Sequence, residues 1–142
     1  MKLRLQYPPE PGHAAQLAEL AVAAARNIDK IVLDYSPQSL TAVDRILESF
    51  HREGLKENQI GETVFSLGCY VGEVLVRHNA GVWKLPKQTA LAKILRRGEN
   101  MMVVELPNGT VCNPIGKAFK YLENGKTESV AYFYQVFAKP EA

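Results

Sequence analysis

The side chains best suited to chemistry lie in one stretch, NQIGETVFSLGCYVGEVLVRHN, at positions 58–79. Its two acids, Glu62 and Glu73, are eleven residues apart. On a helix they share a face but stand about 16 Å apart, whereas a paired acid and base work within about 10 Å. Glu73 has two interpretations: a carboxylate at the edge of a ligand pocket with Tyr70, or the i,i+4 partner of Arg77, which is the commoner arrangement.

The cysteines and histidines show no pattern of a metal centre or a nucleophilic site. Cys69 lies in an apolar helical run, which is typical of an inert buried thiol, and Cys112 follows a predicted hairpin turn. His13, His51 and His78 are far apart, and no zinc, phosphate-loop or serine-elbow motif occurs. We therefore expect free thiols, no metal, no cofactor and no catalytic site.

Basic side chains are concentrated between positions 77 and 97, where six Lys or Arg residues occur without an acid. After Arg77 they are Lys84, Lys87, Lys93, Arg96 and Arg97. The single tryptophan, Trp83, lies among them. An aromatic ring among cations suits contact with bases and phosphates. More often, such a ring packs in the core while the lysines around it are solvated.

Two glycines, Gly68 and Gly72, lie one turn apart in the 58–79 stretch. Each costs a helix about 1 kcal/mol relative to alanine. Because glycine has no Cβ, another backbone can approach it closely. We expect a neighbouring helix or strand to pack there, and the rest of the chain to be organised around this central helix.

Further helices are predicted around it. One covers positions 13–27, and a second begins at Ser36-Pro37, where the serine can cap the first turn, and ends at Gly54. A short helix is predicted over 88–97, and another runs from Asn113-Pro114 to position 124. For positions 127–138 the aromatic content favours a strand, but the apolar spacing favours a helix, which we predict.

Three short apolar runs, VWKLP, MMVVEL and TVCN, predict strands, with a hairpin loop at Pro107-Asn108-Gly109. The predicted class is therefore α+β: a mostly helical domain with a central glycine-containing helix and a small, three-stranded antiparallel sheet. Positions 1–12 contain three prolines and are expected to form an irregular arm or an edge strand.

The length and composition favour one domain. A chain of 142 residues with 46% hydrophobic side chains buries roughly 68–70% of its extended surface on folding. The N-terminus lacks the apolar core of a signal peptide, and no run of about 20 apolar residues occurs. We expect one domain over positions 1–142, in a cytoplasmic protein that does not span a membrane.

Several segments together resemble a family of small bacterial domains of unknown function. They are LDYSPQSLTAVDRIL, SLGCYVGEVLVRHNAGVWK and NPIGKAFKYLENG, followed by an aromatic C-terminal segment, and they cover positions 33–138. The family shares a Ser-Pro helix start, a Gly-x-Tyr-x-Gly-Glu helix, a Gly-x-Trp strand and an Asn-Pro helix. The resemblance implies an α+β fold with a helical last segment, and it implies no activity. The matching residues are Ser36, Pro37, Gly68, Tyr70, Gly72, Glu73, Gly81, Trp83, Asn113 and Pro114.

The function predicted from the sequence is that of a non-catalytic bacterial accessory or protein-interaction domain. Its expected contact surface lies around Tyr70, Glu73, Arg77 and Trp83. One alternative is binding of nucleic acid or another polyanion through the basic 77–97 segment. The other is a small-ligand sensor or enzyme with Glu73 and Tyr70 at a pocket.

Overall fold

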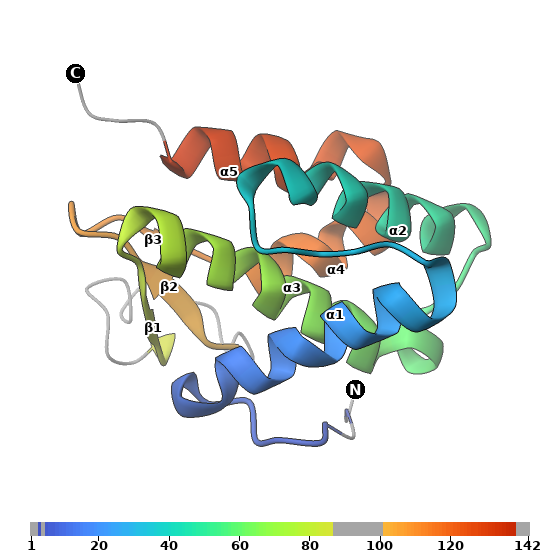
Figure 1. Cartoon of the computed structure of the whole chain (residues 1–142), viewed down its shortest axis with the longest axis horizontal. Helices are drawn as coiled ribbons and strands as arrows, with labels where there is room; N and C mark the ends of the chain where they lie inside the picture. The colour runs from blue at the N-terminus through green and yellow to red at the C-terminus, as the bar shows by residue number, and fades with distance from the viewer. Residues whose placement is uncertain (1–2, 4, 87–100, 139–142) are drawn as a thin grey trace.

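The central helix predicted from the sequence is α3, which lies in the middle of the fold with α1 on one side and α2, α4 and α5 on the other (Figure 1). The computed structural model describes residues 3, 5–86 and 101–138. Its helices are α1 (Ala14–Asp29), α2 (Leu40–Arg52), α3 (Glu57–Asn79), α4 (Pro114–Asn124) and α5 (Val130–Ala138), and its strands are β1 (Val82–Lys84), β2 (Val103–Glu105) and β3 (Val111–Cys112). The predicted α+β class is confirmed. No helix in the described part of the chain is long and apolar enough to cross a membrane.

Helix α3 is buried on all sides over its middle, because every residue from Val64 to Leu75 is buried. The helix begins after Lys56, whose amide donates to Gln59 Oε1 at 2.9 Å. Helix α3 therefore begins at Glu57, one residue before the predicted stretch, and the side chain of Gln59 caps it by reaching back to the Lys56 amide. The helix ends at Ala80, which takes the left-handed conformation with φ of 56°.

The two glycines of α3 make room for different neighbours. A Cβ at Gly68 would lie 2.5 Å from the Cα of Ile115, so the backbone of α4 approaches here as predicted. A Cβ at Gly72 would lie 2.2 Å from two ring carbons of Trp83. Gly72 therefore accommodates an aromatic side chain where a backbone was expected.

The predicted starts of two other helices are confirmed. The Ser39 amide donates to Ser36 Oγ at 3.2 Å, in the 3-10 turn that leads into α2. The Gly116 amide donates to Asn113 Oδ1 at 2.9 Å at the start of α4. After α2, Gly54 takes a φ of 70°, as expected for a left-handed stop.

The sheet is an antiparallel meander in the order β1-β2-β3. Trp83 on β1 lies opposite Val104 on β2, and Val104 lies opposite Cys112 on β3. The β2–β3 loop is closed by a hydrogen bond from the Leu106 amide to the Thr110 carbonyl at 2.8 Å. The predicted helix over 88–97 lies outside the described residues.

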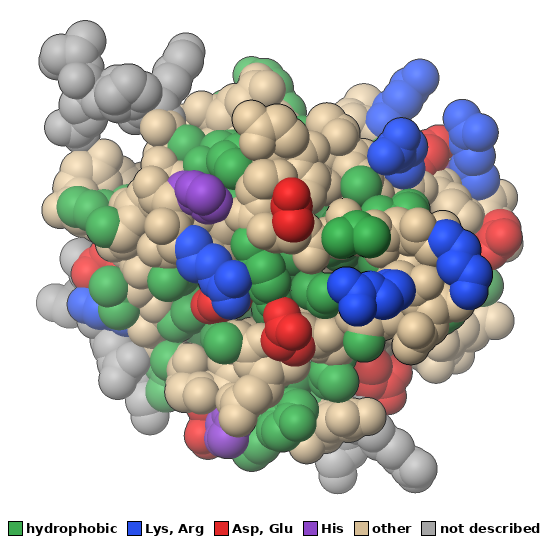
Figure 2. Space-filling model, viewed as in Figure 1, with side chains coloured by type: hydrophobic (Ala, Val, Ile, Leu, Met, Phe, Trp, Pro, Cys, Tyr) green, Lys and Arg blue, Asp and Glu red, His purple; other side chains and the backbone are tan. Residues whose placement is uncertain are grey.

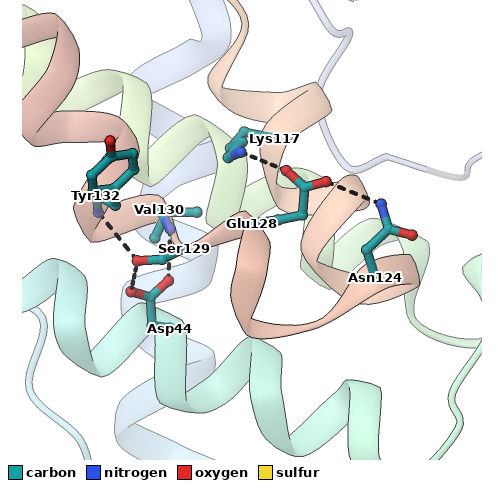
Figure 3. Close-up of polar contacts among 7 residues, drawn as sticks. All are labelled: Asp44, Lys117, Asn124, Glu128, Ser129, Val130 and Tyr132. Atoms are coloured by element: carbon teal, nitrogen blue, oxygen red, sulfur yellow. Dashed lines mark hydrogen bonds and ion pairs between the residues drawn. The ribbon is translucent and has the colours of Figure 1, made fainter.

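The last segment is helical from Val130 to Ala138, which confirms the helix predicted there. Its N-terminus is held by a carboxylate from α2: Asp44 accepts hydrogen bonds from Ser129 Oγ at 2.6 Å and from the Val130 amide at 2.7 Å (Figure 3). Ser129 Oγ in turn accepts from the Tyr132 amide at 3.1 Å. Because these bonds join distant parts of the chain, α5 is fixed on α2 at its first turn.

Candidate functional site

The four residues singled out from the sequence come together where the C-terminal half of α3 faces β1, but three of them are buried. Tyr70, Glu73 and Trp83 are only 0%, 6% and 9% exposed. The side chain of Arg77, by contrast, is 44% exposed. The first three therefore belong to the interior, and Arg77 is the member of the set that faces solvent.

Glu73 is held by two of the other three residues. Its Oε2 accepts a hydrogen bond from Trp83 Nε1 at 2.8 Å, and its Oε1 lies 3.5 Å from Arg77 Nε. The i,i+4 pair with Arg77 is thus present, as the commoner interpretation expected. Because the Trp83 ring also lies directly over Gly72, the glycine, the acid and the indole form one packing unit.

Tyr35, which sequence reasoning did not single out, joins Tyr70 to Arg77. Its φ of 64° is unusual for a tyrosine and needs support from its surroundings. The Tyr35 amide donates to the Tyr70 hydroxyl at 2.7 Å, and His78 Nε2 donates to the Tyr35 carbonyl at 2.8 Å. Both bonds come from α3, so the loop before α2 is fixed by residues 35 and 43 positions further along the chain.

A chain of hydroxyl groups continues from this point. The Ser39 hydroxyl donates to the Ser36 carbonyl at 2.6 Å and lies 2.6 Å from the Tyr70 hydroxyl. Since a serine hydroxyl carries one proton, Tyr70 is the donor to Ser39. The hydrogen bonds therefore run in one direction, from the Tyr35 amide through Tyr70 and Ser39 to Ser36, and they use the full donor capacity of both hydroxyls.

The ring of Tyr35 lies between polar partners. The Arg77 guanidinium carbon is 3.5 Å from the ring centroid, which is a cation–π contact. The Tyr35 hydroxyl donates to Glu19 of α1. Burial, followed by this hydrogen bond, raises the pKa of Tyr35 well above its ordinary value. Tyr35 therefore stays protonated at neutral pH and links α1, α3 and the loop before α2.

The thiols and hydroxyls near this cluster are not activated. Burial raises the pKa of Cys69 far above its ordinary value and raises the pKa of Cys112 to about 12. Burial also raises the pKa of Tyr70. A nucleophile or general base needs the opposite shift, toward neutral pH. Within the described ranges, no buried side-chain nitrogen or oxygen lacks a partner, and no three metal-ligating side chains are grouped.

The structure describes two of the six basic residues in the 77–97 segment, and each faces a carboxylate. Arg77 pairs with Glu73, and Lys84 Nζ lies 2.8 Å from Glu105 Oε1. The remaining four lie outside the described residues: Lys87, Lys93, Arg96 and Arg97. Binding through this segment stays a prediction.

Pockets formed by the described residues occur elsewhere on the molecule. A pocket of about 600 Å³ lies between the end of α2, the start of α3 and the end of α4, where His51, Lys56 and Phe119 are among the lining residues. Two smaller ones, of about 230 and 300 Å³, share Ala21, Ala24 and Thr63 along the contact between α1 and α3. These pockets are not lined by Tyr70 or Glu73, so the pair predicted to sit at a pocket is packed inside the fold.

Comparison of the chain with protein-family models, with curated proteins and with solved structures finds no match. The resemblance to small bacterial domains therefore stays a prediction from the sequence pattern.

Several residues of the cluster were missed by sequence reasoning: Glu19, Tyr35, Ser39 and His78. The available signal was Tyr70, since a tyrosine in a largely apolar helical segment needs a partner for its hydroxyl. The sequence gives no means of choosing that partner among distant residues.

Proposed function

We propose that this chain is a non-catalytic protein-interaction domain that binds its partner through the outer face of α5. One observation carries the proposal: α5 contains no charged residue, yet it leaves Tyr132 and Val136, one turn apart, 66% and 49% exposed. Gln135 is exposed between them. Tyrosine is enriched at interface centres because its ring offers a large contact area and its hydroxyl a hydrogen bond.

The anchoring of α5 supports this role. Asp44 and Ser129 satisfy the first amides of the helix, and Glu128 just before it binds Lys117 at 2.6 Å and Asn124 at 3.0 Å (Figure 3). On the inner face, the ring centroids of Phe133 and Phe137 lie 4.8 Å apart, with the ring planes tilted by 50°. A surface that is already ordered loses less conformational entropy on binding.

The chemistry of α5 specifies the kind of partner. An uncharged helix face gives no ion pair to a charged partner, and burying it removes no charged group from water. The partner we propose is therefore another protein with an apolar, uncharged contact surface. The polyanion alternative has less support from the described residues, because Arg77 and Lys84 face carboxylates. On the face seen in Figure 2, acidic and basic side chains also lie among hydrophobic ones.

The test compares two variants, each of which replaces one exposed hydrophobic residue by glutamate. A protein captured from the native extract is purified, and its affinity is measured for wild type, for Tyr132→Glu and for Ile28→Glu. Ile28 is a matched control because it is 76% exposed on α1, which lies on the other side of α3 from α5 (Figure 1). We expect Tyr132→Glu to weaken binding by about thirtyfold or more, as for an interface hot spot, and Ile28→Glu to bind as wild type does.

Equal affinity for wild type and Tyr132→Glu, with circular dichroism showing both folded, would contradict the proposal. Loss of binding in both variants would show that the effect of Tyr132→Glu is not specific to α5 and would also contradict the proposal. Recovery of nucleic acid that is released by moderate salt would favour the polyanion alternative. Self-association of wild type that Tyr132→Glu abolishes would identify a second copy of this chain as the partner.

A further inference from the structure

The chain contains two Asn-Gly dipeptides, Asn108-Gly109 and Asn124-Gly125. Asn-Gly is the dipeptide most prone to deamidation, because glycine has no Cβ to hinder its amide nitrogen from approaching the preceding side chain. From the sequence alone, the two dipeptides are equally prone to deamidation. In the structure both asparagines are exposed, but Gly109 is exposed whereas Gly125 is buried, and the two side-chain amides have different partners.

Asn108-Gly109 forms the tip of the β2–β3 hairpin, where positions 107–110 are all exposed. The Gly109 amide donates to the Leu106 carbonyl at 2.8 Å, and Gly109 has a φ of 86°. The Thr110 amide donates to Asn108 Oδ1 at 2.9 Å. Because a backbone amide can only donate, the side-chain oxygen must face it. This hydrogen bond draws electrons from the Asn108 carbonyl carbon and so makes the carbon more electrophilic.

Asn124-Gly125 ends α4 and is held in the opposite way. Asn124 Nδ2 donates to Glu128 Oε2 at 3.0 Å, and Glu128 is itself tied to Lys117 (Figure 3). A carboxylate on the amide nitrogen feeds electrons toward the carbonyl and makes the carbon less electrophilic. Gly125 is buried, and its amide donates to the Tyr121 carbonyl at 2.8 Å. Reaction here requires the end of α4 to open.

We propose that Asn108 is a site of spontaneous deamidation in the folded protein and that the fold protects Asn124. The Gly109 nitrogen loses its proton to base and bonds to Asn108 Cγ. The bond from Cγ to the side-chain nitrogen then breaks, and ammonia leaves with that proton equivalent. Water opens the resulting succinimide at either carbonyl, which gives aspartate or isoaspartate at position 108. No oxidation or reduction occurs, and water is the co-reactant.

Either product changes the hairpin tip. Both add a negative charge at position 108, and isoaspartate also adds a carbon to the backbone of a turn held by the bond between Leu106 and Thr110. The change is confined to the tip of the β2–β3 hairpin, which shares no residue with α5. Modification of Asn108 therefore tests a property independent of the proposed interaction surface.

The experiment incubates the full chain at mildly alkaline pH, both folded and in denaturant, and samples it over time. Digestion at acidic pH avoids further reaction, and mass spectrometry of the two separated peptides measures conversion at each site. In the folded chain we expect Asn108 to react at least about tenfold faster than Asn124, because Gly125 is buried and the end of α4 must open locally before Asn124 can react, at a cost of about 1.4 kcal/mol or more. In denaturant the two rates should be similar.

Two variants assign the reaction. Asn108→Gln should remove the acidic species that accumulates in the folded chain, because the longer side chain must close a less favourable ring. The matched control Asn124→Gln should leave that species unchanged. Equal rates at the two sites in the folded chain would overturn the proposal. So would protection of both sites under conditions in which the denatured chain reacts at both.

Discussion

Replacing Gly72 by alanine tests whether Trp83 is a ring packed into the fold. The new Cβ would lie 2.2 Å from Cη2 and Cζ2 of Trp83 and 3.1 Å from Cγ of Pro114. The ring cannot simply swing away, because its Nε1 donates to Glu73 at 2.8 Å. The indole must therefore move and lose this hydrogen bond, or α3 must shift away from β1.

The expected magnitude follows from three contributions. Overpacking a well-filled interior costs about 1–3 kcal/mol, and losing a hydrogen bond to a charged acceptor costs about 1.5–3 kcal/mol. Alanine is better than glycine in a helix by about 1 kcal/mol. We expect a net loss of about 1.5–5 kcal/mol in the free energy of unfolding. A domain of this size has roughly 7–15 kcal/mol, so the variant should still fold.

Urea denaturation followed by the fluorescence of Trp83, the single tryptophan, measures both consequences. The midpoint should fall, and the emission of the folded variant should shift to the red as the ring meets water. Gly12→Ala is the control, because a Cβ there would have no neighbour within 4 Å. A Gly72→Ala variant as stable as wild type, with unchanged emission, would refute the packing of Trp83 on Gly72.

Further predictions concern the other anchors of the fold. Asp44→Ala should destabilise the protein by about 1–3 kcal/mol, because the start of α5 loses its acceptor, and hydrogen exchange should accelerate in α5 before other helices. Trp83→Phe keeps most of the ring but leaves Glu73 without its indole donor, and urea denaturation followed by circular dichroism should show a loss of about 1–3 kcal/mol. Burial raises the pKa of Tyr121 from 10.0 and of Cys112 from 9.0, each to about 12. The folded state thus holds these protons more tightly than the unfolded state, so their stabilisation is complete below about pH 9 and is lost as the pH rises toward 12. Thermal denaturation from about pH 8 to 11 should show a falling Tm, and a constant Tm would contradict this assignment.

Features set by neighbouring residues could be predicted from the sequence. The caps at Ser36 and Asn113 act over three positions, and the left-handed stop at Gly54 depends on a single residue. For the last segment, apolar spacing predicted a helix and composition favoured a strand. The helix is confirmed, because α5 buries Val130 and Phe133 on one face. Such signals are local, so one sequence is enough to read them.

The neighbours of α3 could not be predicted in the same way. Glycine shows that something approaches closely, but not whether it is the backbone of Ile115 or the ring of Trp83. The conformation of Tyr35 is a stronger case, because its positive φ goes against the preference of a tyrosine. It depends on bonds from Tyr70 and His78, which no local pattern connects to it.

The packing of Gly72, Glu73 and Trp83 also changes how the sequence pattern should be interpreted. Glycine makes room for the ring, and the next residue along the helix fixes the ring nitrogen, so a Gly-Glu pair followed by a tryptophan is sufficiently explained by packing between helix and strand. A pattern of this kind can persist for stability alone, and it carries little information about a ligand. Side chains that have no packing role are therefore the better evidence for function. On α5 these are Tyr132 and Val136, which are exposed.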